Sequence, residues 1–202
     1  MPVVGLEKWI KPQFEEISIL KTGNDTGVVE LDGIEFKLYT SISKRAQETA
    51  QIIGKELAVT PIIEVDLQEY RTGLSPEVTR EQAREFTNEL THPIKDWRPY
   101  MNGESFADLY SRAGGILTKI TNECEDVVLI VSHMWFIDKI ISWWLGVSIN
   151  DIKPLTFVTT NASINILSYT KYDEKTLERL NETLHLHTQD FIKPTLDLDF
   201  RP

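Results

Sequence analysis

The sequence has little of three things: cysteine, positive charge and long apolar runs. Its one cysteine, Cys124, cannot form a disulfide within the chain, which fits a reducing cytoplasm. No apolar run approaches the length of a membrane-spanning helix. The first residues, Met1–Val4, have no basic region before an apolar stretch, as a secretory signal would. We therefore expect a cytoplasmic protein that does not enter a membrane.

The scarcity of positive charge limits the partners of this chain. Lysine and arginine number 21 against 31 acidic residues, which gives a formal net charge of −10. An acidic chain is a poor partner for nucleic acid and for anionic membranes, so a phosphorylated ligand would need a local positive pocket. Hydrophobic residues at 41% and a length of 202 residues are typical of one globular domain, which we expect to span residues 1–202.

Three apolar segments are typical of buried strands: Phe36–Thr40, Asp126–Ser132 and Ser163–Tyr169. The second has five apolar residues in unbroken succession, as expected for a central parallel strand that is covered on both faces. Two weaker candidates are an edge strand or extended link that contains a proline and a segment that could pair near the third strand, namely Ala58–Val65 and Leu155–Thr160.

Helical patterns alternate with these strands. The expected helices are Ser43 to about Leu57, Ser75 to about Leu90, Ser105–Cys124 and Met134–Leu145. Gly114-Gly115 is a weak point of the third helix, and Gly146 is expected to end the fourth. Alternation of strands and helices predicts an α/β fold with three α/β/α layers and a mostly parallel sheet. The helical stretch at about residues 75–122 is expected to be an insertion beside the carboxyl edge of that sheet.

Arg45 is the first candidate for a ligand contact. It lies in the first turn of its helix if Ser43 is the cap. Free backbone N–H groups and the helix dipole favour an anion at such a turn, and a guanidinium can hold two phosphate oxygens. The alternative, which position alone favours, is a surface arginine paired with Glu48 or another carboxylate.

His133 and Glu69 are the candidates for proton chemistry. His133 follows directly after the strongest predicted strand, where a parallel sheet delivers residues to its active edge. A histidine there can donate to a phosphoryl oxygen, and the alternative is a hydrogen-bonded core histidine. Glu69 lies in a predicted loop after Ala58–Val65. A carboxyl with a raised pKa could protonate a leaving alkoxide, although a solvated loop glutamate is the commoner case.

Other polar residues near the ends of these elements have structural interpretations as well. Glu104 and Ser105 precede a predicted helix, where they could be an end charge and a cap. Asn161 precedes a strand, where a turn residue is commoner than a ligand contact.

No metal or cofactor site is predicted. His185 and His187 lack a third ligand at the usual spacing. The sequence contains neither a phosphate-cradling glycine loop nor a dinucleotide fingerprint. Trp143 and Trp144 are expected to serve packing or a subunit contact, and they hint at a homodimer.

Five short segments, in this order, resemble signatures of the histidine phosphatase superfamily, also called phosphoglycerate mutase-like. They are TSISKRAQETA at residues 40–50, Leu67-Gln68-Glu69 followed by Gly73, Gly103-Glu104-Ser105, VLIVSH at residues 128–133, and Asn161-Ala162-Ser163-Ile164. The similarity covers about residues 36–186. It implies that Arg45 and His133 bind phosphate and that His133 and Glu69 act in catalysis, Glu69 as the general acid. Ser41, Ser105 and Asn161 would contact these groups and not the ligand itself.

One signature of the family is absent. The family opens with a strand that ends in Arg-His-Gly, whose histidine accepts the phosphoryl group covalently, and no Arg-His pair occurs in this sequence. Gly5–Ile10 already resembles the first helix of the family. We therefore expect the first strand to be missing, and we interpret the chain as a shortened version of a longer protein.

The resemblance implies a phosphomonoester phosphatase that uses a phosphohistidine, with turnover slow or absent in this chain because the acceptor histidine is lacking. The expected ligand is a small-molecule phosphate ester or phosphate. The alternative is a non-catalytic phospholigand-binding or protein-interaction module on the same fold. Neither the substrate nor the choice between phosphatase and mutase follows from the sequence, and the resemblance implies no cofactor and no metal.

Overall fold

The computed structural model describes residues 29–31, 34–75, 77–123, 127–150 and 155–186. In chain order the elements are β1 (Val29–Leu31), β2 (Ile34–Thr40), α2 (Lys44–Leu57), β3 (Ile62–Ile63), the 3₁₀ turn η2 (Val65–Leu67), α3 (Arg80–Arg84), η3 (Ile94–Asp96), α4 (Phe106–Glu123), β4 (Val127–Val131), α5 (Met134–Trp144), β5 (Ile164–Tyr169), β6 (Lys175–Glu182) and η4 (Leu184–Leu186). The sequence features at Gly5–Ile10, Cys124 and His187 lie outside the described residues.

Strand β2 organises the main sheet. It runs parallel to β4, with Phe36 opposite Val127 and Thr40 opposite Val131, and parallel to the short edge strand β3. Among the described strands, β1 alone pairs antiparallel with it. The prediction of an α/β fold with a mostly parallel sheet is confirmed, and the parallel pairing brings the carboxyl ends of β2 and β4 to one edge.

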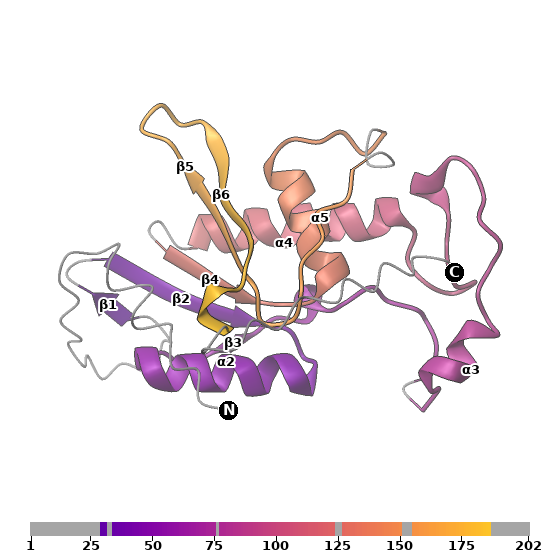
Figure 1. Ribbon diagram of the computed structural model, residues 1–202, viewed down its shortest axis with the longest axis horizontal. Coiled ribbons are helices and arrows are strands. Elements are labelled where there is room, and N and C mark those ends of the chain that lie inside the picture. Colours follow the sequence, from indigo (N-terminus) through magenta and orange to yellow (C-terminus); the bar gives the residue numbers. More distant parts are fainter. Residues whose placement is uncertain (1–28, 32–33, 76, 124–126, 151–154, 187–202) are drawn as a thin grey trace.

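The two faces of this sheet are covered by different helices (Figure 1). Side chains of a strand alternate between faces. Accordingly Val127, Leu129 and Val131 pack with α2, whereas Val128 and Ile130 pack with α4 and α5. The result is three layers, with α2 on one side of the sheet and α4 and α5 on the other.

Strand β4 differs from its prediction in one respect. The sequence predicts a strand buried on both faces, but all five of its residues are half-buried. Both faces are covered, as expected. Within the described residues, however, β4 pairs with β2 alone, so no described strand lies along its other edge. The partial exposure follows from that single pairing.

Helices α4 and α5 pack closely because Gly114 has no side chain. A Cβ at Gly114 would lie closer than 3.0 Å to three atoms of the Trp143 indole. Helix α4 runs without interruption through Gly114 and Gly115, so the expected weak point is not a break. Gly146 has a positive φ of 71°, and its N–H donates to the Trp143 carbonyl, so it ends α5 as predicted.

Two segments form less regular structure than predicted. The helix expected from Ser75 is only α3, which begins after Thr79, where Thr79 and Gln82 form a reciprocal capping box. Phe86 and Leu90 are exposed, so no packed apolar face extends this helix. Residues 155–160 are irregular instead of a strand, and the described neighbour of β5 is β6, which the sequence analysis missed. Strand β6 is missed because its residues are mostly charged or polar and half-exposed.

No helix in the described part of the chain combines the length and apolar character that crossing a bilayer demands.

The two neighbouring glycines of α4 provide a matched test of the packing. Gly114→Ala should lower the free energy of unfolding by about 1–3 kcal/mol because the methyl group overpacks the Trp143 indole. Gly115→Ala meets nothing within 4 Å, so it should raise stability by up to about 1 kcal/mol through helix propensity. Urea unfolding of both variants measures the difference. Effects of the same sign and size would contradict the packing described here.

Candidate active site

The parallel register of β2 and β4 brings Ser41 and His133 together. Thr40 lies opposite Val131, and the Ser41 N–H donates to the Val131 carbonyl over 3.3 Å. Ser41 and His133 therefore follow the ends of neighbouring strands. Ser41 Oγ lies 2.7 Å from His133 Nε2, and both residues are buried.

Arg45 reaches the other nitrogen of the same imidazole ring. Its Nη2 lies 2.8 Å from His133 Nδ1. A guanidinium can only donate, so Nδ1 must be the acceptor, and the proton of the neutral ring lies on Nε2. The Nε2–H then donates to Ser41 Oγ, which also accepts from the Ser43 N–H over 3.2 Å. One tautomer of His133 satisfies all of these contacts.

Burial and neighbouring charge keep His133 neutral. Burial lowers its pKa first, and the positive charges of Arg45 and Arg112 lower it further, to about 4. The imidazole is therefore uncharged near neutral pH and presents a single N–H.

Two helix N-termini meet at this contact. His133 is the N-cap of α5 and Ser43 is the N-cap of α2, and neither makes a capping bond with its side chain. The positive ends of both helix dipoles therefore lie beside Arg45, which is exposed, and this arrangement favours an anion. The alternative partner considered for Arg45, Glu48, pairs instead with Lys44 over 3.7 Å.

Glu69 lies near Arg45 and the first turn of α5. Its carboxylate accepts from the Tyr70 N–H over 2.9 Å, and the N–H groups of Trp135 and Phe136 in the first turn of α5 also lower its pKa. Burial outweighs these groups and the charge of Arg45, so the pKa of Glu69 is raised above its ordinary value. The structure thus brings Arg45, Glu69 and His133 to one edge of the sheet.

Ser105 and Asn161 are not brought into this cluster by any hydrogen bond among the described residues. Ser105 caps α4, because the Asp108 N–H donates to its Oγ over 3.1 Å and its own N–H donates to the Asp108 carboxylate. Asn161 lies in an exposed turn before β5. Glu104 is more than an end charge, because it forms an ion pair with Arg112, with 2.7 Å from Arg112 Nε to Glu104 Oε1.

Arg112 is the functional candidate that the sequence analysis missed. It lies between Leu109 and Ile116, on the apolar stripe of α4, and only 8% of its side chain is exposed. A charged residue on a buried helical stripe requires a buried partner. That position is the signal that could have drawn attention to it.

Trp143, Trp144 and His185 have no described hydrogen bond to Arg45, Glu69 or His133. Trp143 packs on the core and Trp144 is buried, with its indole N–H donating to the Thr176 carbonyl over 3.1 Å. His185 lies in η4. Across the described ranges there is no group of three histidine, cysteine or acidic side chains arranged to hold a metal.

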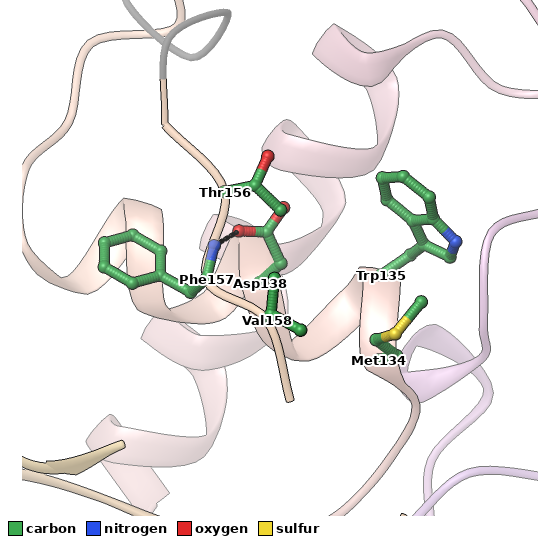
Figure 2. A pocket seen from close by; sticks show the side chains of 6 residues that line it. All are labelled: Met134, Trp135, Asp138, Thr156, Phe157 and Val158. Atoms are coloured by element: carbon green, nitrogen blue, oxygen red, sulfur yellow. Dashed lines mark hydrogen bonds between the residues drawn. The ribbon is translucent and has the colours of Figure 1, made fainter. Parts of the chain in front are cut away.

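A small pocket lies beside the first turns of α5. Figure 2 shows its lining residues, Met134, Trp135, Asp138, Thr156, Phe157 and Val158. The Asp138 carboxylate accepts from the Phe157 N–H over 2.8 Å, and Lys139 pairs with the same carboxylate. This contact fixes the irregular segment 155–158 on α5. The pocket lining does not include Arg45, Glu69 or His133.

The chain matches the model of the histidine phosphatase superfamily (branch 1) over residues 27–183. No curated protein matches its sequence.

Three solved structures resemble this fold. An open reading frame product of Mycobacterium tuberculosis is 25% identical with a TM-score of 0.56, over 73% of this chain and 72% of that one. A mycobacterial glucosyl-3-phosphoglycerate phosphatase in complex with VO3 is 20% identical with a TM-score of 0.58, over 72% and 75%. The α-ribazole phosphatase of Shigella flexneri is 20% identical with a TM-score of 0.58, over 72% of each chain.

The low pKa of His133 predicts how stability depends on pH. Between pH 6.5 and about 4 the unfolded chain binds a proton at this residue and the folded chain does not. The contribution of His133 is therefore complete above pH 6.5 and is lost as pH falls toward 4, by roughly 3 kcal/mol. Ser41 and Arg45 bond the two ring nitrogens, and the charge of Arg112 also acts on the ring.

Urea unfolding of the wild type and of His133→Gln between pH 4 and pH 8 measures this contribution. Glutamine does not titrate, so the stability difference between wild type and variant should shift toward the wild type as pH rises from 4 to 6.5 and then stay constant. A difference that is flat across this window would contradict the low pKa of His133.

Proposed function

This chain belongs to the histidine phosphatase superfamily, and we propose that it binds the phosphate group of a small phosphate ester between Arg45 and His133, with Glu69 as proton donor to the leaving group. This proposal rests on the contacts between the N-terminus of α2 and the N-terminus of α5. There Arg45 Nη2, His133 and Ser41 are linked over 2.8 and 2.7 Å at two helix N-termini.

Each group has a part in this proposal that its contacts support. The exposed Arg45 guanidinium can exchange its bond to His133 Nδ1 for phosphate oxygens, which it holds more strongly as charged acceptors. The N–H of His133 Nε2, which donates to Ser41 Oγ, can turn to a phosphoryl oxygen. Glu69, whose pKa burial raises, keeps its proton to a higher pH and can give it to a departing alkoxide.

The covalent step is the part for which this sequence supplies no residue. In the resembling family a histidine of an Arg-His-Gly strand accepts the phosphoryl group, and this sequence contains no Arg-His pair. His92 is exposed in a loop, and His185 lies in η4. We therefore propose that this chain binds phosphate esters with slow or no turnover, and the alternative role is a non-catalytic phospholigand-binding or interaction module.

The proposed ligand class rests on the same group of residues, Arg45, His133 and Ser41. Because the chain has a net charge of −10, an anion would bind where positive charge is locally concentrated. Solved neighbours include phosphatases named for glucosyl-3-phosphoglycerate and for α-ribazole, which supports a phosphate ester without selecting one. We also propose a cytoplasmic location, because a single cysteine suits a reducing compartment. A homodimer stays a prediction.

Arg45→Ala tests phosphate binding against a matched neighbour. Loss of a charge-assisted contact should weaken the Kd for inorganic phosphate or vanadate about 10- to 100-fold. Lys44→Ala removes the adjacent cation, whose side chain is 90% exposed, and should change the Kd less than threefold. Isothermal titration calorimetry at constant pH and salt measures both. Equal affinity of Arg45→Ala and wild type would contradict the proposed phosphate-binding site.

Addition of an Arg-His-Gly strand ahead of residue 1 distinguishes between the two proposed roles, an impaired phosphatase and a non-catalytic binding module. The present chain should hydrolyse p-nitrophenyl phosphate at or near the uncatalysed rate, and the extended protein should be faster by orders of magnitude. The control is the same extension with Arg-Ala-Gly. An extended protein that binds phosphate but leaves several phosphate esters intact would favour the non-catalytic role.

A further inference from the structure

Every N–H of the Arg112 guanidinium has an acceptor. Nε and Nη2 donate to the two carboxylate oxygens of Glu104, each over 2.7 Å. Nη1 donates to the carbonyls of Asp66 and Gln68 over 2.7 and 2.9 Å, and Nη2 also donates to the carbonyl of Glu69 over 3.3 Å. These acceptors account for all five donors that an arginine has.

Three of those acceptors belong to one short stretch of backbone, the segment Asp66–Glu69. The fourth carbonyl of that segment, of Leu67, accepts from Ser132 Oγ over 2.8 Å. Side chains therefore hold all four consecutive carbonyls of the segment that leads to Glu69. A segment outside regular strands and α-helices seldom receives so many side-chain donors, since such carbonyls usually bond to water or to backbone.

Arg112 also contacts the element that receives the Glu69 carboxylate. Its guanidinium lies over the Phe136 ring, 4.5 Å from the centroid. The Phe136 N–H, in the first turn of α5, is one of the groups that act on that carboxylate. One buried side chain of α4 thus touches both the backbone before Glu69 and the helix turn against which its carboxylate lies.

An ion pair with Glu104 alone would not explain this geometry. A bidentate pair uses two of the five donors, and the remaining three would need only solvent or any nearby oxygen. Here the side chain is 8% exposed and Glu104 is 12% exposed, so both charges are withdrawn from water at a cost. The three further hydrogen bonds offset that cost and fix the segment before the proposed acid.

We propose that Arg112 is the positioning residue of this site: its planar guanidinium fixes Asp66–Glu69 and so holds the Glu69 carboxyl at the start of α5, beside Arg45. This inference rests on the proposed function, in which Glu69 gives a proton to the leaving group. It assigns no contact between Arg112 and the substrate.

Arg112→Lys tests the inference because it keeps the charge but cannot make the planar fork. The readout is the pKa of the Glu69 carboxyl, followed by carbon NMR and assigned with Glu69→Gln. In the wild type burial raises that pKa, and the groups that face the carboxyl are Arg45 of α2 and the N–H groups of Tyr70, Trp135 and Phe136. Release of the segment should let water reach the carboxyl, so its pKa should fall toward the ordinary 4.5. Phosphate affinity should change less than threefold.

Arg71→Lys is the matched control. Arg71 lies near the same Glu104 carboxylate, at 3.9 Å, and bonds the Asp66 carboxylate over 2.7 Å, but its side chain donates to none of the four carbonyls. It should leave the Glu69 titration unchanged. An unchanged titration in Arg112→Lys, or an equal shift in Arg71→Lys, would overturn the inference.

The two proposals fail separately. If the wild-type protein does not bind phosphate, the proposed function is wrong. The Glu69 titration still tests whether Arg112 positions the carboxyl. If Arg112→Lys does not fold, Glu104→Gln takes its place, because an amide can accept from only one arm of the fork. Its Glu69 pKa should move in the same direction by a smaller amount, and an unchanged pKa would overturn the inference.

Discussion

The contact from the Arg45 guanidinium to His133 Nδ1, over 2.8 Å, is the interaction on which the site depends. It exists because β2 and β4 are parallel and in register, so that α2 and α5 begin side by side. Because a guanidinium only donates, the contact also places the ring proton on Nε2 and sets its direction toward Ser41. The register of β2 and β4 therefore determines where the two helices begin and, through the Arg45 contact, which nitrogen of His133 carries the proton.

The site concentrates positive potential within an acidic protein. The chain has a net charge of −10, yet Arg45, Arg112 and two helix N-termini surround the buried ring of His133. Glu104 pairs with Arg112, while the Glu69 carboxyl lies near Arg45, and burial raises the pKa of Glu69 despite the charge of Arg45. The raised pKa of this carboxyl is the property that the proposed role of proton donor to a departing group requires.

The sequence predicts those parts whose signals are local. Unbroken apolar residues indicate β4, helical spacing indicates α4, and His133 can be found because it follows the strongest strand, whereas position alone favours a surface role for Arg45, which the family resemblance singles out. The partners of Arg112 cannot be found in this way, because Glu104 and the backbone of Asp66–Glu69 reach it only through the packing of α4 on the sheet. Residues 155–158 likewise lie against α5 through a tertiary contact, in which the Phe157 N–H donates to the Asp138 carboxylate. Local pattern thus predicts the helices and strands and the position of His133, whereas tertiary contacts determine which groups Arg112 and Asp138 bind.

A crystal structure of the protein with vanadate tests the central claim most directly. The account predicts one anion whose oxygens lie within hydrogen-bond distance of Arg45 and of His133 Nε2, with the Arg45–His133 bond exchanged for bonds to the anion. An anion bound only elsewhere, or an unchanged Arg45–His133 contact at saturating vanadate, would contradict it.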